Sequence, residues 1–244
     1  MRFKVSVSYD GSEFHGWQKQ NHVRSVQEEI EICISKISKK ETKIYASGRT
    51  DAKVHALNQV FHFDSEVNMT SDNWEKALQS LLPDDILVNR VEEVDDNFHA
   101  RYDAKSKEYR YHILQGEQDV FKRNYAYYIG ESLDIKTMKH AAAFFIGTHD
   151  FSSFNATSYE EISDQVRTVY SIDIYRVDNG IVIKVIGDGF LRYMVRMMVG
   201  SLIEIGKHKH EPEFIQDKLN EKTKGIVPYR APAHALYLYS VRYD

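Results

Sequence analysis

The most informative part of the sequence is GRTDAKVHA, residues 48–56. Short apolar runs lie on both sides of it, at 44–46 and 60–63, so we expect a loop between two strands. The loop carries Arg49, Asp51 and His55 within seven residues. Nearby positive charge keeps a carboxyl group ionised, and an ionised carboxylate is a nucleophile or a base. An aspartate in this setting is also a common turn or helix-cap residue, so the loop alone indicates only a candidate site.

Periodic patterns around this loop predict further strands and helices. Apolar and polar residues alternate at the N-terminus, as in a half-buried strand. Ser25 and Glu28 predict a capping box that begins a helix, and Ser71 is expected to cap a second helix that stops at Pro83. The predicted strands of this part span 3–9, 86–94 and 105–115.

The rest of the chain continues the mixture of helices and strands. Asp134 is expected to begin a helix, and Asp178-Asn179-Gly180 predicts a hairpin turn between strands at 166–177 and 181–187. The remaining predicted elements are a long apolar helix at 189–206, a short helix at 211–220 and a closing strand at 235–241. Mixed elements with antiparallel hairpins indicate the α+β class.

Composition restricts the kind of protein. The chain has 244 residues, of which 42% are hydrophobic and 28% charged, as in ordinary soluble globular proteins. We find no membrane-spanning run and no signal pattern, so we expect no membrane association. Cys33 is the only cysteine, which favours a reducing cytoplasm. A net charge of −4 argues against a protein that coats nucleic acid indiscriminately, but it allows a local basic cleft.

Several blocks, taken together and in order, resemble the tRNA pseudouridine synthase A (TruA) family. The blocks besides residues 48–56 are YDG at 9–11, GWQ at 16–18, SVQ at 25–27, LPDDI at 82–86, FHAR at 98–101, KEYRY at 107–111, GTHDF at 147–151, FLRYMVR at 190–196, APA at 231–233 and LYL at 236–238. They run from residue 9 to residue 238, so the resemblance covers nearly the whole chain.

The resemblance implies a fold and an activity. The fold is α+β, with two similar ferredoxin/RRM-like halves whose antiparallel sheets form one continuous surface. The halves would span 1–104 and 105–244, with a cleft between them. The implied enzyme is a homodimeric isomerase that converts uridine to pseudouridine at positions 38, 39 and 40 of the tRNA anticodon stem-loop, flipping each base out of the stem. The reaction involves no redox change or group transfer, so no cofactor is expected.

The resemblance also assigns roles to residues. Asp51 matches the essential aspartate, which would attack either C1′ of the sugar or C6 of uracil. Arg49 and Arg196 would flank it, keep it charged and fill the space that the flipped base leaves. Tyr109 would lie against the target base, and Tyr111 is the alternative. The possible RNA contacts are Lys53, Arg110 and Arg192, and the last is expected to share one helix face with Arg196. No metal site is expected, because His208 with His210, and His149 with Asp150, lack the ligand number and spacing of a known site.

Three positions depart from the family pattern. Lys53, Asn58 and Ala235 stand where the family has glycine, which often marks a positive φ angle that lysine adopts with difficulty.

Two other functions are alternatives to the tRNA isomerase. One is a non-catalytic RNA-binding or tRNA-folding protein. The other is a carboxylate-dependent nucleosidase, which needs a second acid that the sequence does not offer near Asp51.

Overall fold

The computed structural model describes residues 1–244 and divides the chain into two compact units. Unit 1 comprises Met1–Lys105 and Tyr237–Asp244, and unit 2 comprises Ser106–Leu236. The sequence placed all of 105–244 in the second half. The last strand instead belongs to unit 1, because it pairs with a strand of that unit.

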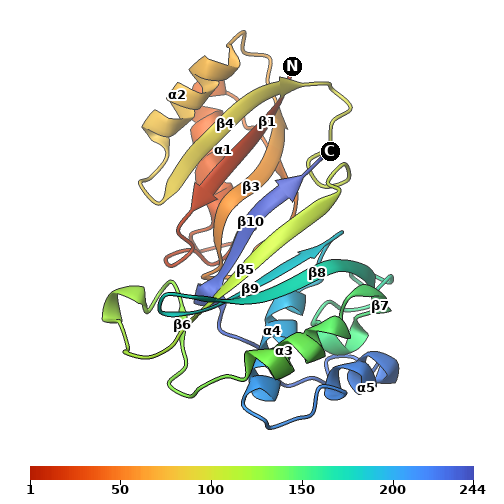
Figure 1. Ribbon diagram of the computed structural model, residues 1–244. Helices are drawn as coiled ribbons and strands as arrows, with labels where there is room; N and C mark the ends of the chain where they lie inside the picture. The colour runs from red at the N-terminus through yellow and green to blue at the C-terminus, as the bar shows by residue number, and fades with distance from the viewer. The chain divides into compact units, whose positions relative to one another are not determined.

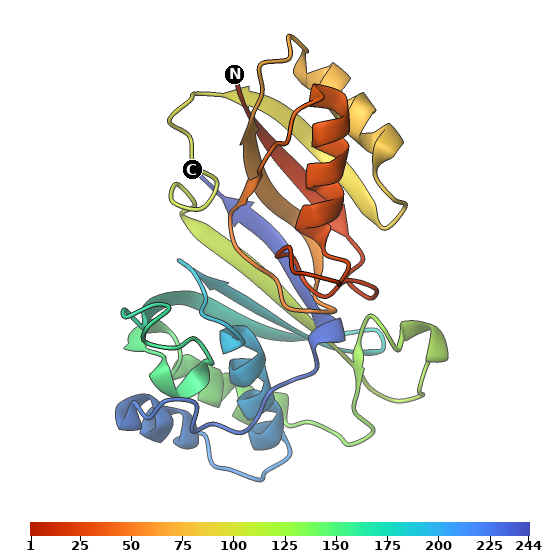
Figure 2. The same ribbon diagram turned by 180° about the vertical axis from the view of Figure 1, so that it is seen from behind.

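Unit 1 is an antiparallel sheet with one parallel strand at its side (Figure 1). Its strands are β1 (Arg2–Tyr9), β2 (Tyr45–Ala46), β3 (His55–Asp64), β4 (Ile86–Val94) and β10 (Leu236–Arg242). They follow the order β4-β1-β3-β10, with β2 also paired to β3. Helices α1 (Val26–Ser38) and α2 (Ser71–Leu81) lie on one face of the sheet (Figure 2).

The core of unit 1 follows from the alternation in β1. Phe3, Val5 and Val7 are fully buried, while the residues between them are half-buried. The ring of Trp74 on α2 lies 5.8 Å from that of Phe3 and 5.0 Å from that of Phe63 on β3. Burying such aromatic rings gives large apolar stabilisation, and here it fixes α2 to the two central strands.

Of the two predicted helix caps in unit 1, Ser25 has the predicted position without the predicted hydrogen bonds, and Ser71 is not the cap. Ser25 occupies the cap position of α1, but its side chain makes no capping hydrogen bond and its Oγ is buried without a partner. The cap of α2 is Thr70, whose Oγ accepts from the amide of Asn73. Ser71 is the first helical residue, and its Oγ accepts from the amide of Glu93 on β4 instead.

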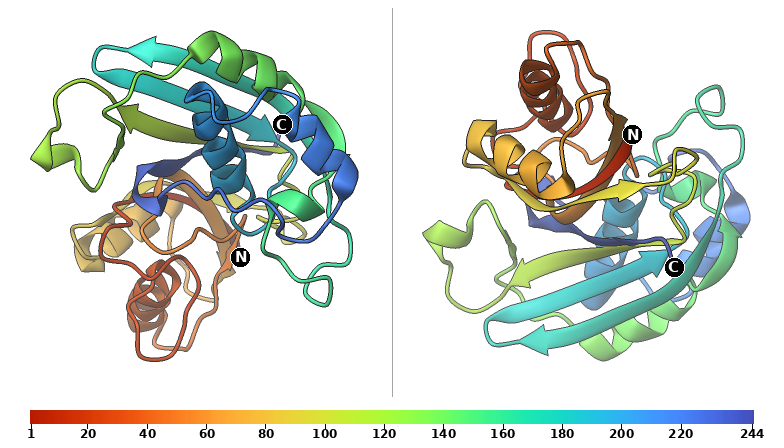
Figure 3. Two further views of the ribbon diagram at one scale, coloured as in Figure 1. Left: turned by 90° about the horizontal axis from the view of Figure 1, so that it is seen from below. Right: turned by 90° about the horizontal axis from the view of Figure 1, so that it is seen from above.

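Unit 2 contains a further set of mostly antiparallel strands, and its long hairpin stands out in Figure 3. Its strands are β5 (Ser106–Leu114), β6 (Tyr127–Tyr128), β7 (Gly147–Asp150), β8 (Val166–Val177) and β9 (Gly180–Gly187). They follow the order β5-β9-β8-β7, with β6 parallel to β5. The helices are α3 (Ile135–Ala143), α4 (Met194–Gly206) and α5 (Phe214–Glu221), and the short 3₁₀ turns are η1 (Val120–Lys122), η2 (Ser152–Phe154) and η3 (Ala233–Ala235).

Several sequence predictions for unit 2 are confirmed, and two helix boundaries are corrected. The hairpin between β8 and β9 turns at Asp178 and Asn179, and Asp134 caps α3 by accepting from two backbone amides. Helix α4 begins at Met194 rather than at residue 189, because Tyr193 before it adopts a left-handed φ of 64°. Helix α5 begins at Phe214, after Pro212 rather than around it.

The α+β class and the predominance of antiparallel pairing agree with the sequence prediction. No helix combines the length and the apolar character needed to cross a membrane.

Candidate active site

The loop that carries Asp51 connects β2 to β3 in unit 1, as the sequence predicted. Asp51 is half-buried, while Arg49 and Lys53 are exposed. The amide of Val54 donates to the Asp51 carbonyl at 3.2 Å, which closes a tight turn directly after the aspartate. The structure therefore brings Arg49, Asp51 and Lys53 together on one short turn.

Backbone hydrogen bonds hold this turn against the loop that follows β1. The amide of Trp17 donates to the carbonyl of Thr50 at 3.0 Å, and the amide of Lys53 donates to the carbonyl of Phe14 at 3.2 Å. These bonds fix the residues on both sides of Asp51. A carboxylate on a pinned backbone loses little conformational freedom when it meets a substrate, which is the arrangement that catalysis favours.

Gly16 allows the close approach of the two loops. Its φ is +99°, and a Cβ at this position would lie 2.8 Å from the carbonyl oxygen of Thr50 and 3.1 Å from the amide nitrogen of Ala52. Only glycine combines this φ angle with such close backbone contact. Gly16 belongs to the GWQ block at 16–18, but nothing in the sequence indicates that it supports the aspartate.

A contact between two buried hydroxyl groups, those of Tyr9 and Thr50, also supports this turn. The hydroxyl of Tyr9, at the end of β1, lies 2.8 Å from Oγ1 of Thr50. Both residues are buried. Burial raises the pKa of Tyr9, so its hydroxyl stays protonated and remains a partner for Thr50. Alternation alone assigned Tyr9 to the core of a strand, and it gave no sign of this contact.

On the other side of the loop, His55 joins three separate segments. The residue is buried, and its Nδ1 accepts from the amide of Gly11 at 3.0 Å. Its ring stacks on that of Tyr237 at a centroid distance of 4.7 Å. Tyr237 is paired with His55 in the parallel β3–β10 register. His55 therefore positions the end of the loop.

The backbone at Lys53 has the left-handed conformation that a glycine at this position in the family predicts. Its φ is +66°, so this position does require the left-handed conformation that glycine favours. The other two positions do not require it, because neither Asn58 in β3 nor Ala235 in η3 has a positive φ. Ala235 is fully buried, so its side chain serves packing.

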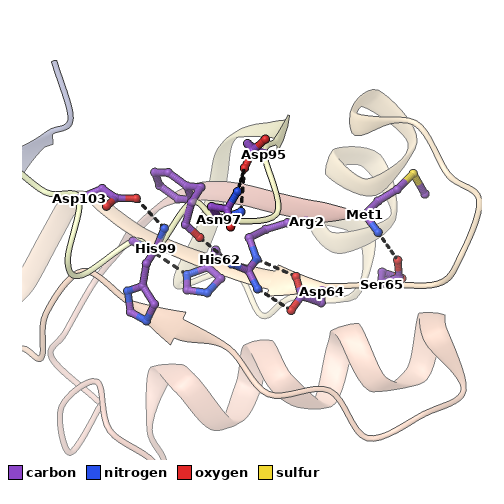
Figure 4. Close-up of polar contacts among 11 residues, drawn as sticks. Met1, Arg2, His62, Asp64, Ser65, Asp95, Asn97, His99 and Asp103 are labelled. Carbon is purple, nitrogen blue, oxygen red and sulfur yellow. Dashed lines mark hydrogen bonds and ion pairs between the residues drawn. The ribbon is translucent and has the colours of Figure 1, made fainter.

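A polar network anchors the Phe98–Arg101 block to the sheet of unit 1 (Figure 4). Arg2 forms a bidentate ion pair with Asp64, at 2.7 and 2.9 Å, and also donates to the carbonyl of Phe98 at 2.8 Å. Nδ1 of His62 accepts from the amide of Ala100 at 3.1 Å. Burial lowers the pKa of His62 to about 4, so the imidazole is neutral at neutral pH and free to accept this bond.

In unit 2, the two candidate tyrosines lie on the same face of β5 but differ in their partners. Tyr111 is fully buried, and its hydroxyl donates to the carbonyl of Pro232 at 3.0 Å. Its role is therefore structural. Tyr109 keeps a small exposed fraction of 9% and packs edge-on against Phe190, with ring centroids 5.4 Å apart. Of the two tyrosines, Tyr109 is therefore the one that keeps an exposed part.

Of the predicted RNA contacts in unit 2, Arg110 is engaged within its own strand. Its Nε donates to the buried carboxylate of Glu108 at 2.7 Å. Residues two apart on a strand share a face, so the strand periodicity is consistent with this pair. The ion pair neutralises much of the charge that Arg110 would offer to a phosphate.

Arg192 and Arg196 do not share a helix face, contrary to expectation. Arg196 lies in the first turn of α4, and Arg192 precedes the helix. The two guanidinium groups nevertheless meet at the ring of Tyr193, at 4.8 Å for Arg192 and 5.2 Å for Arg196. Arg230 approaches the same ring at 4.4 Å. Tyr193 and Arg230 were not among the sequence candidates.

Comparison with known proteins identifies the class of this molecule. The protein-family profile described as "tRNA pseudouridine synthase" matches residues 5–103 and 141–244. Such a match over most of the chain defines an isomerase that acts on RNA.

Relatives that match the whole chain have names of the same class. A protein named tRNA pseudouridine synthase A from Exiguobacterium sp. is 46% identical over 243 residues, which is 100% of this chain and 98% of the relative. Its counterpart from Bacillus licheniformis is 44% identical and covered completely in both directions. A solved structure titled "Crystal Structure of a Cbf5-Nop10-Gar1 Complex" covers 83% of this chain and 54% of its own, with 15% identity and a TM-score of 0.35, too low to support any comparison. The chain belongs to the tRNA pseudouridine synthase family and isomerises uridine in tRNA.

Proposed function

We propose that this enzyme makes pseudouridine at positions 38, 39 and 40 of the tRNA anticodon stem-loop, with Asp51 as the nucleophile. The observation that carries the proposal is the support of the Asp51 turn. Two backbone hydrogen bonds, from Trp17 and to Phe14, hold it on either side. A carboxylate so placed, two residues from an exposed Arg49, suits covalent attack rather than a solvated turn.

The isomerisation needs only this carboxylate and a means to hold the base. In one route an oxygen of Asp51 bonds to C1′ as the N1–C1′ bond breaks, and the freed uracil turns before C5 displaces the carboxylate. In the other route the oxygen adds to C6 of the uracil, the N1–C1′ bond breaks, the base turns and C5 bonds to C1′, and the bond between C6 and Asp51 then breaks. In both routes the proton on C5 is lost, N1 gains a proton and the carboxylate is regenerated, so no cofactor is consumed.

Residues of unit 2 are proposed to contact the same nucleotide. Tyr109 would lie against the flipped uracil, and Arg196 would stabilise the charge of the attacking carboxylate. The nearly complete burial of Tyr109 and its packing against Phe190 support a rigid contact of this kind. We also propose, from the family resemblance, that the enzyme works in the cytoplasm as a homodimer; the single buried cysteine, Cys33, accords with a reducing compartment.

The test replaces Asp51 with Asn and maps pseudouridine in tRNA by chemical probing. The carboxamide keeps the shape of the side chain but is a poor nucleophile, so the modification rate should fall by about 10³-fold or more. The matched control is Asp96→Asn, which makes the same change at an exposed position of unit 1 and should keep the full rate. Retained modification in the Asp51 variant would refute the assignment.

The same preparation decides between the rival functions. An enzyme used at substoichiometric concentration should convert many tRNA molecules, which a non-catalytic RNA-binding protein cannot do. Activity on free uridine with none on tRNA would instead indicate a nucleosidase. Modification at sites outside positions 38 to 40 would contradict the proposed substrate range.

A further inference from the structure

We propose that Arg192 and Arg230, held by the ring of Tyr193, form a clamp for one backbone phosphate of the RNA. This inference rests on the proposed function, which makes a folded RNA the substrate. The clamp is a second contact point in unit 2. It gives Arg192, a possible RNA contact from the sequence, a specific ligand, and it adds Tyr193 and Arg230, which the sequence did not indicate.

The first observation is an unusual convergence of positive charge. Three guanidinium groups, from Arg192, Arg196 and Arg230, lie 4.8, 5.2 and 4.4 Å from the centre of the Tyr193 ring. No two of them are therefore more than about 10 Å apart, which is roughly the Debye length at 0.1 M salt. Like charges at this spacing repel one another, and an anion placed between Arg192 and Arg230 relieves the repulsion between these two.

The second observation is that Arg192 and Arg230 have no acidic partners. The side chain of Arg192 donates to the hydroxyl of Tyr193 at 3.1 Å, and the guanidinium group of Arg230 lies over the same ring. Neither arginine makes an ion pair, whereas Arg24 and Arg110 each pair with a carboxylate. Both Arg192 and Arg230 are exposed, so their remaining N–H groups can reach a ligand.

The third observation is that the cluster is held in place. Tyr193 adopts a φ of 64°, a costly conformation for an aromatic residue and one that concentrates at functional sites. The amide of Arg192 donates to Oγ1 of Thr157 at 2.9 Å, and its carbonyl accepts from the amide of Ala156 at 3.0 Å. Nε of Arg196 donates to the carbonyl of Ala231, which fixes the segment that bears Arg230.

The chemistry of these groups selects the ligand. Guanidinium groups bind phosphate oxygens in bidentate geometry, and a planar ring that orients them reduces the freedom lost on binding. A backbone phosphodiester carries one negative charge and is available at every nucleotide. Contacts of this type position an RNA without reading its sequence, which suits an enzyme that acts on several adjacent uridines.

The experiment measures the affinity of the full-length protein for tRNA across a range of salt concentrations. The double variant Arg192→Gln/Arg230→Gln should bind about 10-fold more weakly, and the slope of log affinity against log salt should become shallower by about 1. The matched control is Lys136→Gln/Lys139→Gln, which removes two exposed positive charges from α3 and should leave the slope unchanged. An unchanged slope in the arginine variant would overturn the proposal.

A second arm identifies the phosphate. Anticodon stem-loop RNAs with a single uncharged methylphosphonate linkage are compared, one linkage at a time. At one linkage the substitution should weaken binding of the parent protein by about 10-fold and leave binding of the double variant unaffected, because the contact is already lost. Additive losses at every linkage would overturn the clamp. Inhibition of the parent protein by inorganic phosphate, with no linkage-dependent loss, would show a site for free anions and would also overturn it.

Two further variants separate loss of the clamp from loss of folding and from loss of charge. If the double variant fails to fold by circular dichroism, the single variant Arg230→Gln at an exposed position serves instead, with an expected loss of at least 3-fold in affinity. Arg230→Lys should recover the salt slope but only part of the affinity, because lysine keeps the charge without the planar fork. The clamp is judged by binding and the proposed function by pseudouridine formation, so either can fail while the other stands.

Discussion

Replacing Gly16 with Ala tests whether the support of the Asp51 turn matters for catalysis. The new methyl group would lie 2.8 Å from the carbonyl oxygen of Thr50, and ordinary contact begins at 3.4 Å. The turn must therefore retreat by about 0.6 Å. The φ of +99° adds a conformational cost of about 1–2 kcal/mol for any residue other than glycine. We expect a loss of stability of about 2–4 kcal/mol, because the clash adds to this conformational cost.

The substitution should also slow catalysis by the molecules that remain folded. Displacement of a reacting group by about 1 Å can cost about 10²-fold in rate, so a shift of somewhat more than half that distance should lower kcat/KM by about 10-fold or more. Steady-state pseudouridine formation below the melting temperature of the variant measures this loss.

Gly116 provides the matched control. Its φ is +81°, but an added Cβ would meet nothing within 4 Å. Gly116→Ala should therefore show the conformational cost alone, with unchanged kcat/KM. Equal activities for the two variants would refute the view that contact between Gly16 and Thr50 sets the position of Asp51.

Two further predictions concern pH and backbone strain. The pKa of His62 is about 4 in the folded state and about 6.5 in the unfolded state. As the pH falls, the unfolded chain therefore binds a proton at this residue before the folded chain does. The free energy of unfolding should fall by about 2 kcal/mol between pH 7.5 and 5.0. Urea unfolding measures this loss, and a pH dependence that persists undiminished in His62→Asn would contradict its origin. Lys53→Gly should raise the free energy of unfolding by about 0.5–1 kcal/mol, because the φ of +66° suits glycine, whereas Lys53→Ala should not. Equal stabilities of these two variants in thermal melts would contradict strain at residue 53, and a shared loss of tRNA affinity would identify the amine as an RNA contact.

Local patterns predicted most of the secondary structure because they record which side of an element is buried. Alternation located β1, and Asp-Asn-Gly located the β8–β9 turn. Helix starts were less predictable, since several hydroxyls compete for each cap. Ser71 has the right chemistry for a cap, but the amide of Glu93, distant in sequence, takes its oxygen. The start of α4 likewise depends on the left-handed backbone of Tyr193, which a run of apolar residues does not reveal.

The candidate site was predictable only where its residues are adjacent in sequence. The Asp51 turn is a continuous motif, and its left-handed position at Lys53 could be predicted from the glycine that the family has there. The contacts of Tyr9 and Gly16 with Thr50 join segments more than 30 residues apart, and no periodicity encodes them. The position of Arg230 beside Tyr193 is equally non-local. Such contacts depend on how the chain packs, which requires the three-dimensional structure.

The parallel pairing of β10 with β3 has a consequence for biosynthesis. Tyr237 and Leu238 align with His55 and Ala56, immediately after the Asp51 turn. All of unit 2 lies between these partners in the chain. As the polypeptide leaves the ribosome, the edge of β3 that pairs with β10 stays unpaired until unit 2 and then β10 have been synthesised. The nascent chain therefore cannot complete unit 1 early, and the unpaired edge of β3 is open to a chaperone or to another unfolded chain during synthesis.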